Sequence, residues 1–337
     1  MSNSAIKQLL KSIDKQLDQA TSSEDVLNAV SLAVSFGAPV RFNYFKPILI
    51  GCVLLLIAIG LLTYGFQYEP SDATDAAVLV GMLLFIAGIV PMVVAGLAKK
   101  RLRKVSDKAF QIDSLLDNKL SKQAAPSARE LAQQYTEFNQ GNHKREIWDW
   151  YRGEYEGSEH SFHYFYYRFH YVDRRRETYT TTNSKGETVT KTRIVYDHYD
   201  RYGLIMPYEF AKNLHIVSRG MRGDYEKKYK TDSLVFNKDL TVYCDDDLDA
   251  AKFFKPSIIV AFEDFGKEFK RINLEIPDNG NLCLSFDNSD LLNGTREKDL
   301  TEPQAFYDEL AGHTDLVKLN TALEFIHQVM KHTDSNF

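Results

Sequence analysis

Four histidines in an aromatic part of the chain are the residues best suited to bind a metal ion, namely His160, His163, His170 and His198. Residues three apart on a strand point to opposite faces, so His160 and His163 are poorly placed to share one ion. The pair also lacks the helical HExxH arrangement, in which two histidines four apart share a face with a glutamate. The pattern favours ordinary, partly buried histidines, and we predict no metal site.

A run of acids after Cys244 could bind a divalent cation, because 245–247 are all aspartate and Asp249 follows. The run lacks the ligand spacing and the central glycine of a calcium-binding hand. Acids at the start of a helix cap free N–H groups and complement the helix dipole. We therefore interpret these aspartates as the cap of a helix that extends to Phe254.

A group of cations around a predicted hairpin could contact lipid headgroups, nucleic acid or an acidic partner. It consists of Arg174, Arg175, Arg176, Lys185, Lys191 and Arg193. Nearby acids dilute the positive charge, which favours a solvated hairpin tip. We retain these six residues as candidate contacts to a partner or to headgroups.

Motifs for catalysis or nucleotide binding are missing: the sequence has no GxSxG, P-loop, GxGxxG or CxxC pair. Active sites are assembled by geometry, so this does not exclude catalysis, but we predict no catalytic residue and no cofactor. Cys52, Cys244 and Cys283 lack close spacing, which fits a reducing compartment. The formal net charge of -5 gives no reason to expect nucleic acid as a partner.

Two uncharged runs near the N-terminus, 47–66 and 76–98, are long enough to cross a bilayer. At about 1.5 Å per residue, each reaches roughly the 30 Å of the hydrocarbon core. Core helices of soluble proteins are usually shorter and carry a polar face. The sequence therefore predicts a transmembrane hairpin over 46–98.

Charges on either side of these runs set the orientation. The inner-face flank after the second run consists of Lys99, Lys100, Arg101, Arg103 and Lys104, whereas the connector 67–75 has three acids and no Lys or Arg. Positive charge stays on the cytoplasmic side, so we expect both termini inside. The flank would also favour anionic headgroups at roughly 1 kcal/mol per cation, but ordinary topology-setting charges are the favoured explanation.

Small residues recur every seven positions in both runs, at Gly51, Ala58 and Gly65 and at Gly81, Gly88 and Ala95. Small side chains let two helix backbones approach each other closely. The spacing predicts that the two helices pack together in a left-handed crossing.

The remaining chain mixes helices and strands without a βαβ rhythm, so the fold class is α+β. We expect cytoplasmic amphipathic helices in 1–45, a basic juxtamembrane helix in 99–125 and an α+β domain in 126–337. Within that domain we predict a projecting hairpin over 161–200, a helical stretch over 128–138, strands at 234–236 and 240–244, and a hairpin over 271–286. A helical turn is expected at 208–214.

Two spans, a basic inner flank and the segments LVFNKDLTVYCDDDLDAAKFFKPSIIVAFEDF and RINLEIPDNGNLCLSF resemble the bacterial family labelled domain of unknown function 3137. The likeness covers roughly residues 45–290. The family is uncharacterised and supplies no catalytic residue. The resemblance implies a protein of the bacterial cytoplasmic membrane.

The functional hypothesis is a membrane-anchored interaction or scaffold module, binding another protein or a second copy of itself at the cytoplasmic face. A membrane-proximal enzyme is an alternative, and a pocket gathering His160, His198 and Asp200 would favour it. A lipid or membrane-surface sensor is the third possibility. It requires the cations at 99–104 and 174–176 to face one plane.

Overall fold

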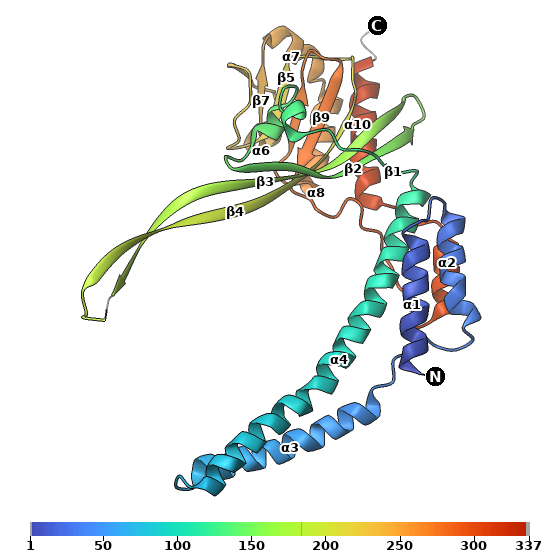
Figure 1. The fold of residues 1–337 in the computed structure, drawn as a ribbon. Coiled ribbons are helices and arrows are strands. Elements are labelled where there is room, and N and C mark those ends of the chain that lie inside the picture. Colours follow the sequence, from blue (N-terminus) through green and yellow to red (C-terminus); the bar gives the residue numbers. More distant parts are fainter. Residues whose placement is uncertain (1, 183, 335–337) are drawn as a thin grey trace. The chain divides into compact units, whose positions relative to one another are not determined.

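The computed structural model describes residues 2–182 and 184–334, which belong to two compact units (Figure 1). Unit 1 comprises 1–117 and 294–314, and unit 2 comprises 118–293 and 315–337. Unit 1 is helical, whereas unit 2 contains an antiparallel sheet with helices, so the α+β class is confirmed. Residues 294–314 lie in unit 1, although the sequence reading had included them in the 126–337 domain.

Three helices pack around one end of a fourth in unit 1. They are α1 (Asn3–Leu17), α2 (Ser23–Ser35) and α9 (Pro303–Leu310), and the fourth is α4 (Asp72–Asp117). Ser22 caps α2, because its side chain accepts a hydrogen bond from the backbone N–H of Asp25. The apolar faces of α1 and α2 close on α4, so the first 45 residues contribute to a protein core. The α1 and α4 side chains in this core are Ile6, Leu10, Ile13, Leu17, Leu102, Val105, Ala109 and Phe110.

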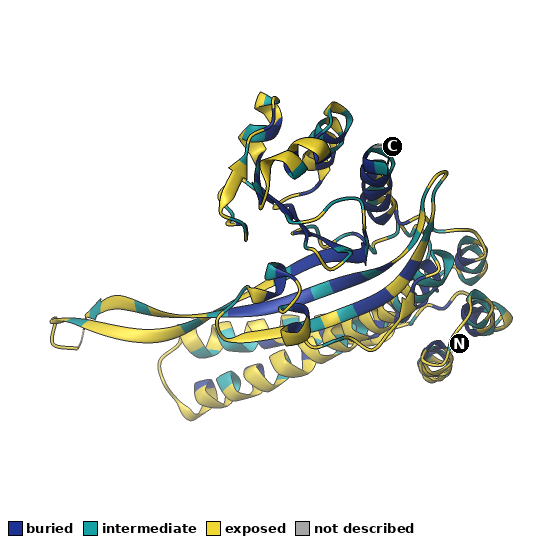
Figure 2. Cartoon of the chain, turned by 90° about the horizontal axis from the view of Figure 1, so that it is seen from above, coloured by how far each residue is buried: buried dark blue, intermediate teal, exposed yellow. Residues whose placement is uncertain are grey.

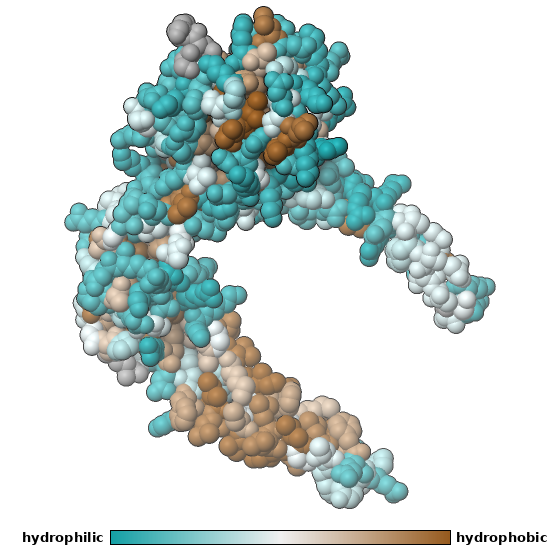
Figure 3. All heavy atoms as spheres, turned by 180° about the vertical axis from the view of Figure 1, so that it is seen from behind, coloured by the Kyte–Doolittle hydropathy of each residue, from teal (hydrophilic) through white to brown (hydrophobic). Residues whose placement is uncertain are grey.

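The long helices of unit 1 are α3 (Phe45–Gln67), with 23 residues, and α4, with 46. Both are long and apolar enough to cross a membrane, and only 11% of the apolar window of each is buried. Figure 3 shows hydrophobic side chains covering this pair of helices. The predicted helix over 99–125 is not separate, because α4 continues through Pro91 and ends at Asp117.

Unit 2 is built on nine antiparallel strands among the described residues, in the order β1-β2-β3-β4-β9-β8-β5-β7-β6. Their bounds are β1 Ser121–Lys122, β2 Lys144–Glu156, β3 Ser161–Thr182, β4 Thr188–Pro207, β5 Leu214–Ser218, β6 Lys227–Tyr229, β7 Leu240–Cys244, β8 Asn273–Ile276 and β9 Asn281–Phe286. The predicted hairpins over 161–200 and 271–286 are thus β3–β4 and β8–β9.

Aromatic side chains fill the core of unit 2. Phe138 packs on Tyr167 and Phe169 of β3, with ring centroids 5.0 and 5.1 Å apart. Phe265 stacks on Phe325 at 4.1 Å, which joins two helices to each other. The helices of this unit are α5 Ala128–Leu131, the 3-10 helix η1 Thr136–Asn139, α6 Leu234–Asp239, α7 Asp247–Phe253, α8 Pro256–Glu268 and α10 Val317–Asp334.

Three local predictions were wrong or only partly right. Residues 234–236 start helix α6 instead of a strand, because the Ser233 side chain caps Phe236 N–H and a helix buries Phe236 alone while Leu234 and Val235 stay exposed. Residues 208–213 contain no helical turn and lead directly into β5. The stretch 128–138 is two short pieces, α5 and η1, instead of one helix.

Candidate functional site

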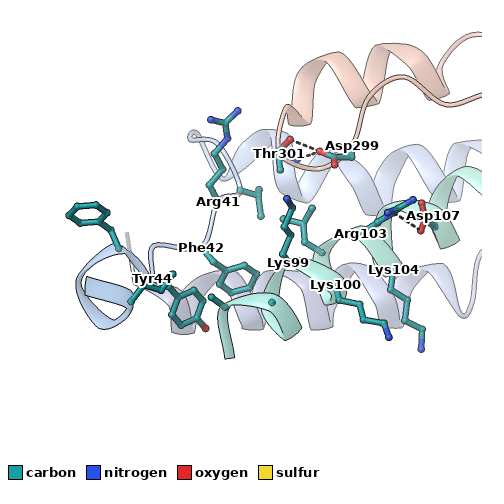
Figure 4. Close-up of a pocket in the computed structure, with 16 residues that line it drawn as sticks. Arg41, Phe42, Tyr44, Lys99, Lys100, Arg103, Lys104, Asp107, Asp299 and Thr301 are labelled. Atoms are coloured by element: carbon teal, nitrogen blue, oxygen red, sulfur yellow. Dashed lines mark hydrogen bonds and ion pairs between the residues drawn. The ribbon is translucent and has the colours of Figure 1, made fainter. Parts of the chain in front are cut away.

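The largest cavity described in unit 1 has a volume of about 1180 Å³ and lies where the apolar part of α4 meets its basic part (Figure 4). One wall comes from α4, between Ala95 and Asp107. The opposite wall comes from the segment 40–45 and the start of α3, and Asp299 and Thr301 add a polar edge. The cavity is therefore apolar at one end and charged at the other.

Helical spacing explains why the cations of α4 gather at this cavity. Lys99 and Arg103 are four residues apart, as are Lys100 and Lys104, so each pair shares a side of the helix. Figure 4 shows Lys100 and Lys104 projecting side by side, with Phe42 and Tyr44 lying next to α4. Four of the five predicted flank cations line the cavity, and Arg101 does not.

Most of the positive charge at the cavity is not neutralised. Arg103 pairs with Asp107 at 3.8 Å, but Asp107 also accepts a 2.6 Å hydrogen bond from Arg296. Asp299 accepts hydrogen bonds from the backbone and the side chain of Thr301. Within the described chain no acid pairs with the remaining cations of the lining, which are Arg41, Lys99, Lys100 and Lys104.

The small residues predicted to pack α3 on α4 lie between these helices. A Cβ built on Gly65 would lie 2.3 Å from a Val78 methyl group, and one on Gly81 would lie 2.9 Å from Leu62. Ala58 is fully buried. Gly51 and Gly88 face each other, whereas Ala95 is half-buried and lines the cavity.

Strands β3 and β4 continue past the sheet as a two-stranded ribbon, the exposed extension in Figure 2. β2 pairs with β3 only as far as Val172, and β9 pairs with β4 only from Tyr202 onward. Beyond these residues, β3 and β4 are each other's sole strand partners in the described structure. We call the segments 173–182 and 188–201 the ribbon.

The six predicted hairpin cations do not form one patch, because neighbouring residues on a strand point to opposite faces. Arg174 lies opposite Tyr196 and Arg176 opposite Ile194, on what we call the first ribbon face. The second ribbon face carries Arg175, Lys191 and Arg193. Lys185 belongs to the turn between the strands.

Acids pair with Arg175 and Arg193 on the second ribbon face and, among the described residues, with neither arginine on the first. Arg175 Nε donates to Asp197 at 2.6 Å, and Arg193 Nη2 lies 2.7 Å from a carboxylate oxygen of Glu177. In the described structure, Arg174 and Arg176 have no ion pair, and their neighbours Ile194 and Tyr196 are 47% and 46% exposed. The first ribbon face therefore combines unpaired guanidinium groups with apolar surface.

Three of the residues considered for chemistry meet at the base of the first ribbon face. His170 Nδ1 lies 2.8 Å from Asp200 Oδ1, and His170 Nε2 lies 3.2 Å from His198 Nδ1. Burial raises the pKa of Asp200, but hydrogen bonds from Arg168 and His170 outweigh that effect and lower the pKa. Trp148 stacks on the His170 ring at 3.9 Å, which fixes the imidazole.

This Asp–His arrangement resembles the part of a catalytic triad that orients a base. A triad also needs a nucleophile on the second imidazole nitrogen, and here that position is taken by His198. The geometry supports a hydrogen-bonded relay of two histidines and does not reproduce a hydrolytic site.

The other two predicted histidines lie apart from this relay. His160 Nε2 is 3.2 Å from a carboxylate oxygen of Asp334, and His163 is exposed on β3. The pocket that would have joined His160 to His198 and Asp200 is therefore not formed. The acidic run after Cys244 acts as a cap, as predicted, because the Asp246 side chain accepts from Leu248 N–H at the start of α7.

Sequence reasoning missed a buried ionic network in the sheet of unit 2. Arg201 is 1% exposed, and its Nε and Nη1 donate at 2.7 and 2.5 Å to Glu137 and Asp287. Burial alone would lower the pKa of Arg201, but these two carboxylates raise it. Asn273 links Glu137 to Glu275, with Nδ2 donating to Glu137 at 2.6 Å and to Glu275 at 3.0 Å.

His215, Asp224 and Glu275 hold three potential metal ligands within 4.8 Å of one another. The ligand atoms of His215 and Glu275 already have protein hydrogen-bond partners. His215 Nδ1 accepts from the backbone N–H of Asp224 at 3.0 Å, so His215 Nε2 carries the proton and donates to Asn273. Burial raises the pKa of Glu275, whose carboxylate accepts hydrogen bonds from the backbone and hydroxyl of Thr136. The arrangement is that of a hydrogen-bonded polar network. Sequence reasoning missed it because its residues are far apart in the chain and form no motif.

Comparison of the chain with protein-family models, with curated proteins and with solved structures found no match.

Proposed function

We propose that the chain is a membrane-anchored interaction module, inserted through α3 and α4 and contacting a protein partner through the first ribbon face. The anchor is supported by two long apolar helices that expose most of their side chains. Taking large apolar side chains out of water contributes roughly 1.5–3 kcal/mol each, so such surfaces favour a bilayer. The inner-face flank supports an orientation with both termini in the cytoplasm, and the resemblance to a bacterial family supports the bacterial inner membrane as the location.

The observation that carries the interaction proposal is the ribbon. A two-stranded ribbon is at best marginally stable in water, and its open edges invite pairing with other chains. Apart from Arg201 at its base, no ribbon side chain is among the buried residues of the described chain, so burial in this chain does not account for the length of the ribbon. Its open edges, exposed side chains and unpaired arginines suit a partner with an acidic surface.

Topology is tested first, with a reporter inserted at Thr74, in the first turn of α4 directly after the connector from α3. We expect the reporter to read the non-cytoplasmic side, and alkaline carbonate to leave the protein in the membrane fraction. A cytoplasmic reading at Thr74, or release by carbonate, contradicts the anchor.

The ribbon is tested by photo-crosslinking in cells, with a photoreactive phenylalanine analogue replacing Tyr196 or Tyr179. These tyrosines are 46% and 41% exposed and lie on the first and second ribbon faces, so they form a matched pair. We expect a discrete protein adduct from Tyr196 and none from Tyr179. An adduct at twice the mass of the chain would identify a second copy as the partner.

Charge reversal on the ribbon distinguishes crosslinking to a specific partner from crosslinking by random collision. The double change Arg174→Glu and Arg176→Glu should abolish the Tyr196 adduct, whereas Lys191→Glu on the second ribbon face should leave it intact. Equal adducts from both tyrosines, or no adduct from either, would reject the ribbon as the contact surface.

The resemblance of residues 45–290 to the bacterial family of domain of unknown function 3137 stays a prediction. It agrees with the proposed membrane anchor and supplies no site residue.

A further inference from the structure

We propose that the cavity between α4 and the segment 40–45 binds one anionic glycerophospholipid of the inner leaflet. The phosphate would lie beside Lys100 and Lys104, and the acyl chains would lie along the apolar end beside Ala95 and Gly96. This inference rests on the proposed membrane anchor, because only that orientation brings inner-leaflet lipids to the cavity.

Charge is the first argument. Five cationic and two acidic side chains line the cavity, and both acids are already hydrogen-bonded to protein groups. Lysine ammonium groups are strongly hydrated and carry three donors each, which suits phosphate oxygens. Lys100 and Lys104 project side by side from α4 and Lys99 projects from another side of it (Figure 4), and none of the three has a protein acceptor for its ammonium group in the described structure.

Shape and polarity are the second argument, and they favour a lipid over free phosphate. A cavity of about 1180 Å³ exceeds the roughly 300–1,000 Å³ of pockets for drug-sized ligands. Side chains of Val40, Phe42, Phe45 and Ile48 line the part nearest the apolar run. A Cβ added to Gly96 would meet no atom within 4 Å, so α4 leaves an open groove at that position. Free phosphate would use the cations and leave this apolar wall in contact with water.

Position is the third argument. The cations begin directly after the apolar run of α4, which is the depth at which headgroup phosphates lie if α4 spans the bilayer. Aromatic side chains with a polar tip prefer this same interface, and Tyr44 stands opposite the lysines (Figure 4). The ordinary role of such cations is to set topology by their number alone. A binding site requires in addition that particular cations matter more than their neighbours.

The test is native mass spectrometry of the full chain, extracted in neutral detergent and exposed to equal amounts of phosphatidylglycerol and phosphatidylcholine. We expect one phosphatidylglycerol to remain bound in preference to phosphatidylcholine. The double variant Lys100→Gln and Lys104→Gln should reduce phosphatidylglycerol retention by tenfold or more. Each cation near the surface raises the affinity for an anionic lipid by somewhat less than tenfold, and the variant removes two of them.

The matched control is Lys46→Gln with Arg101→Gln. It removes the same amount of charge, one cation from the start of α3 and one from the inner-face flank, but neither residue lines the cavity. Retention should stay within about twofold of wild type for this control, given that only distant charge is lost. Equal losses in the two double variants would overturn the site and leave a general charge effect.

A steric pair gives an independent readout that keeps all charges. Gly96→Leu should fill the apolar groove and lower lipid retention, whereas Gly60→Leu should not, although both glycines have open space around them. Unchanged retention in Gly96→Leu would also overturn the site.

Two further outcomes are decisive. Displacement of phosphatidylglycerol by millimolar inorganic phosphate would replace the lipid by a free anion as ligand and reject the proposal. Carbonate extraction of the membranes from which the chain is purified separates the two failures, because a chain that leaves the membrane refutes the anchor. A chain that stays in the membrane without lipid selectivity refutes the lipid site alone.

Discussion

Gly51 and Gly88 face each other across the contact between α3 and α4 so closely that a Cβ built on Gly51 would lie 2.6 Å from the Gly88 carbonyl oxygen. A Cβ on Gly88 would in turn lie 2.9 Å from the Gly51 carbonyl oxygen. Backbone atoms occupy both positions and cannot rotate away, so neither glycine tolerates a side chain without separation of the helices.

Replacing Gly88 by Leu should therefore separate the helices at their point of closest approach. Overpacking of this kind costs about 1–3 kcal/mol, which corresponds to a fall in Tm of several degrees for a chain of this size. Thermal melting in neutral detergent, followed by helical circular dichroism, measures the effect. Gly60→Leu is the matched control, because the same change there meets open space, and equal shifts in both variants would contradict the packing.

Breaking the buried ion pair of Arg201 and Glu137 should strongly destabilise unit 2. Arg201→Met leaves Glu137 buried at 0% side-chain exposure without its charge partner, at a cost of about 3–5 kcal/mol. Adding Glu137→Met should recover a large part of that loss, because the remaining uncompensated charge is removed. Both tryptophans of the chain, Trp148 and Trp150, belong to unit 2, so urea unfolding monitored by tryptophan fluorescence reports this unit. Equal stability of the single and double variants would contradict the pairing.

Asp113 should make the stability of unit 1 depend on pH. It is fully buried on α4, its carboxylate has no hydrogen-bond partner in the described structure, and burial followed by the nearby Asp117 raises its pKa from 3.8 to about 7. The folded state then holds the proton more tightly than the unfolded chain, so this contribution is fully present below about pH 4 and is lost as the pH rises through 7.

Asp113→Asn should remove that dependence. The variant should match wild type near pH 4 and become more stable by up to about 4 kcal/mol at pH 8, given about 1.4 kcal/mol per pKa unit. Hydrogen exchange of peptides from α1, α2 and α4, measured at both pH values, reports unit 1 directly. A constant difference between the two proteins across this range would show that Asp113 does not titrate as proposed.

Removing the end of the ribbon should leave unit 2 folded. Residues 176–194 are replaced by Asn-Gly, which favours a tight turn between the paired residues Arg175 and Val195. Because the removed side chains lie outside the core clusters, the free energy of unfolding obtained from urea titration should change by less than about 1 kcal/mol. A large loss of stability would mean that the ribbon serves the fold and would weaken its role as a contact surface.

Local patterns account for what the sequence alone determined. Uninterrupted apolar runs, the period of small residues and the Ser22 cap are properties of neighbouring residues, and each appears in the structure as α3, α4 and the start of α2. The hairpin of β8 and β9 and the cap at Asp246 likewise depend on residues that are close together in the sequence. Local signals failed at 234–236, where apolar β-type residues form a helix because Ser233 caps it and only Phe236 is buried.

Tertiary structure alone decided which distant side chains meet. Arg201 reaches Glu137 across 64 positions of the chain, and no periodicity marks either residue. Strand pairing divided five of the six hairpin cations between two faces, because a shift of one residue moves a side chain to the other side of the ribbon. The cavity beside Lys99 likewise needs the segment 40–45 to fold back against α4. Such contacts depend on how elements pack in three dimensions, and the sequence encodes that packing only through the sum of many weak interactions.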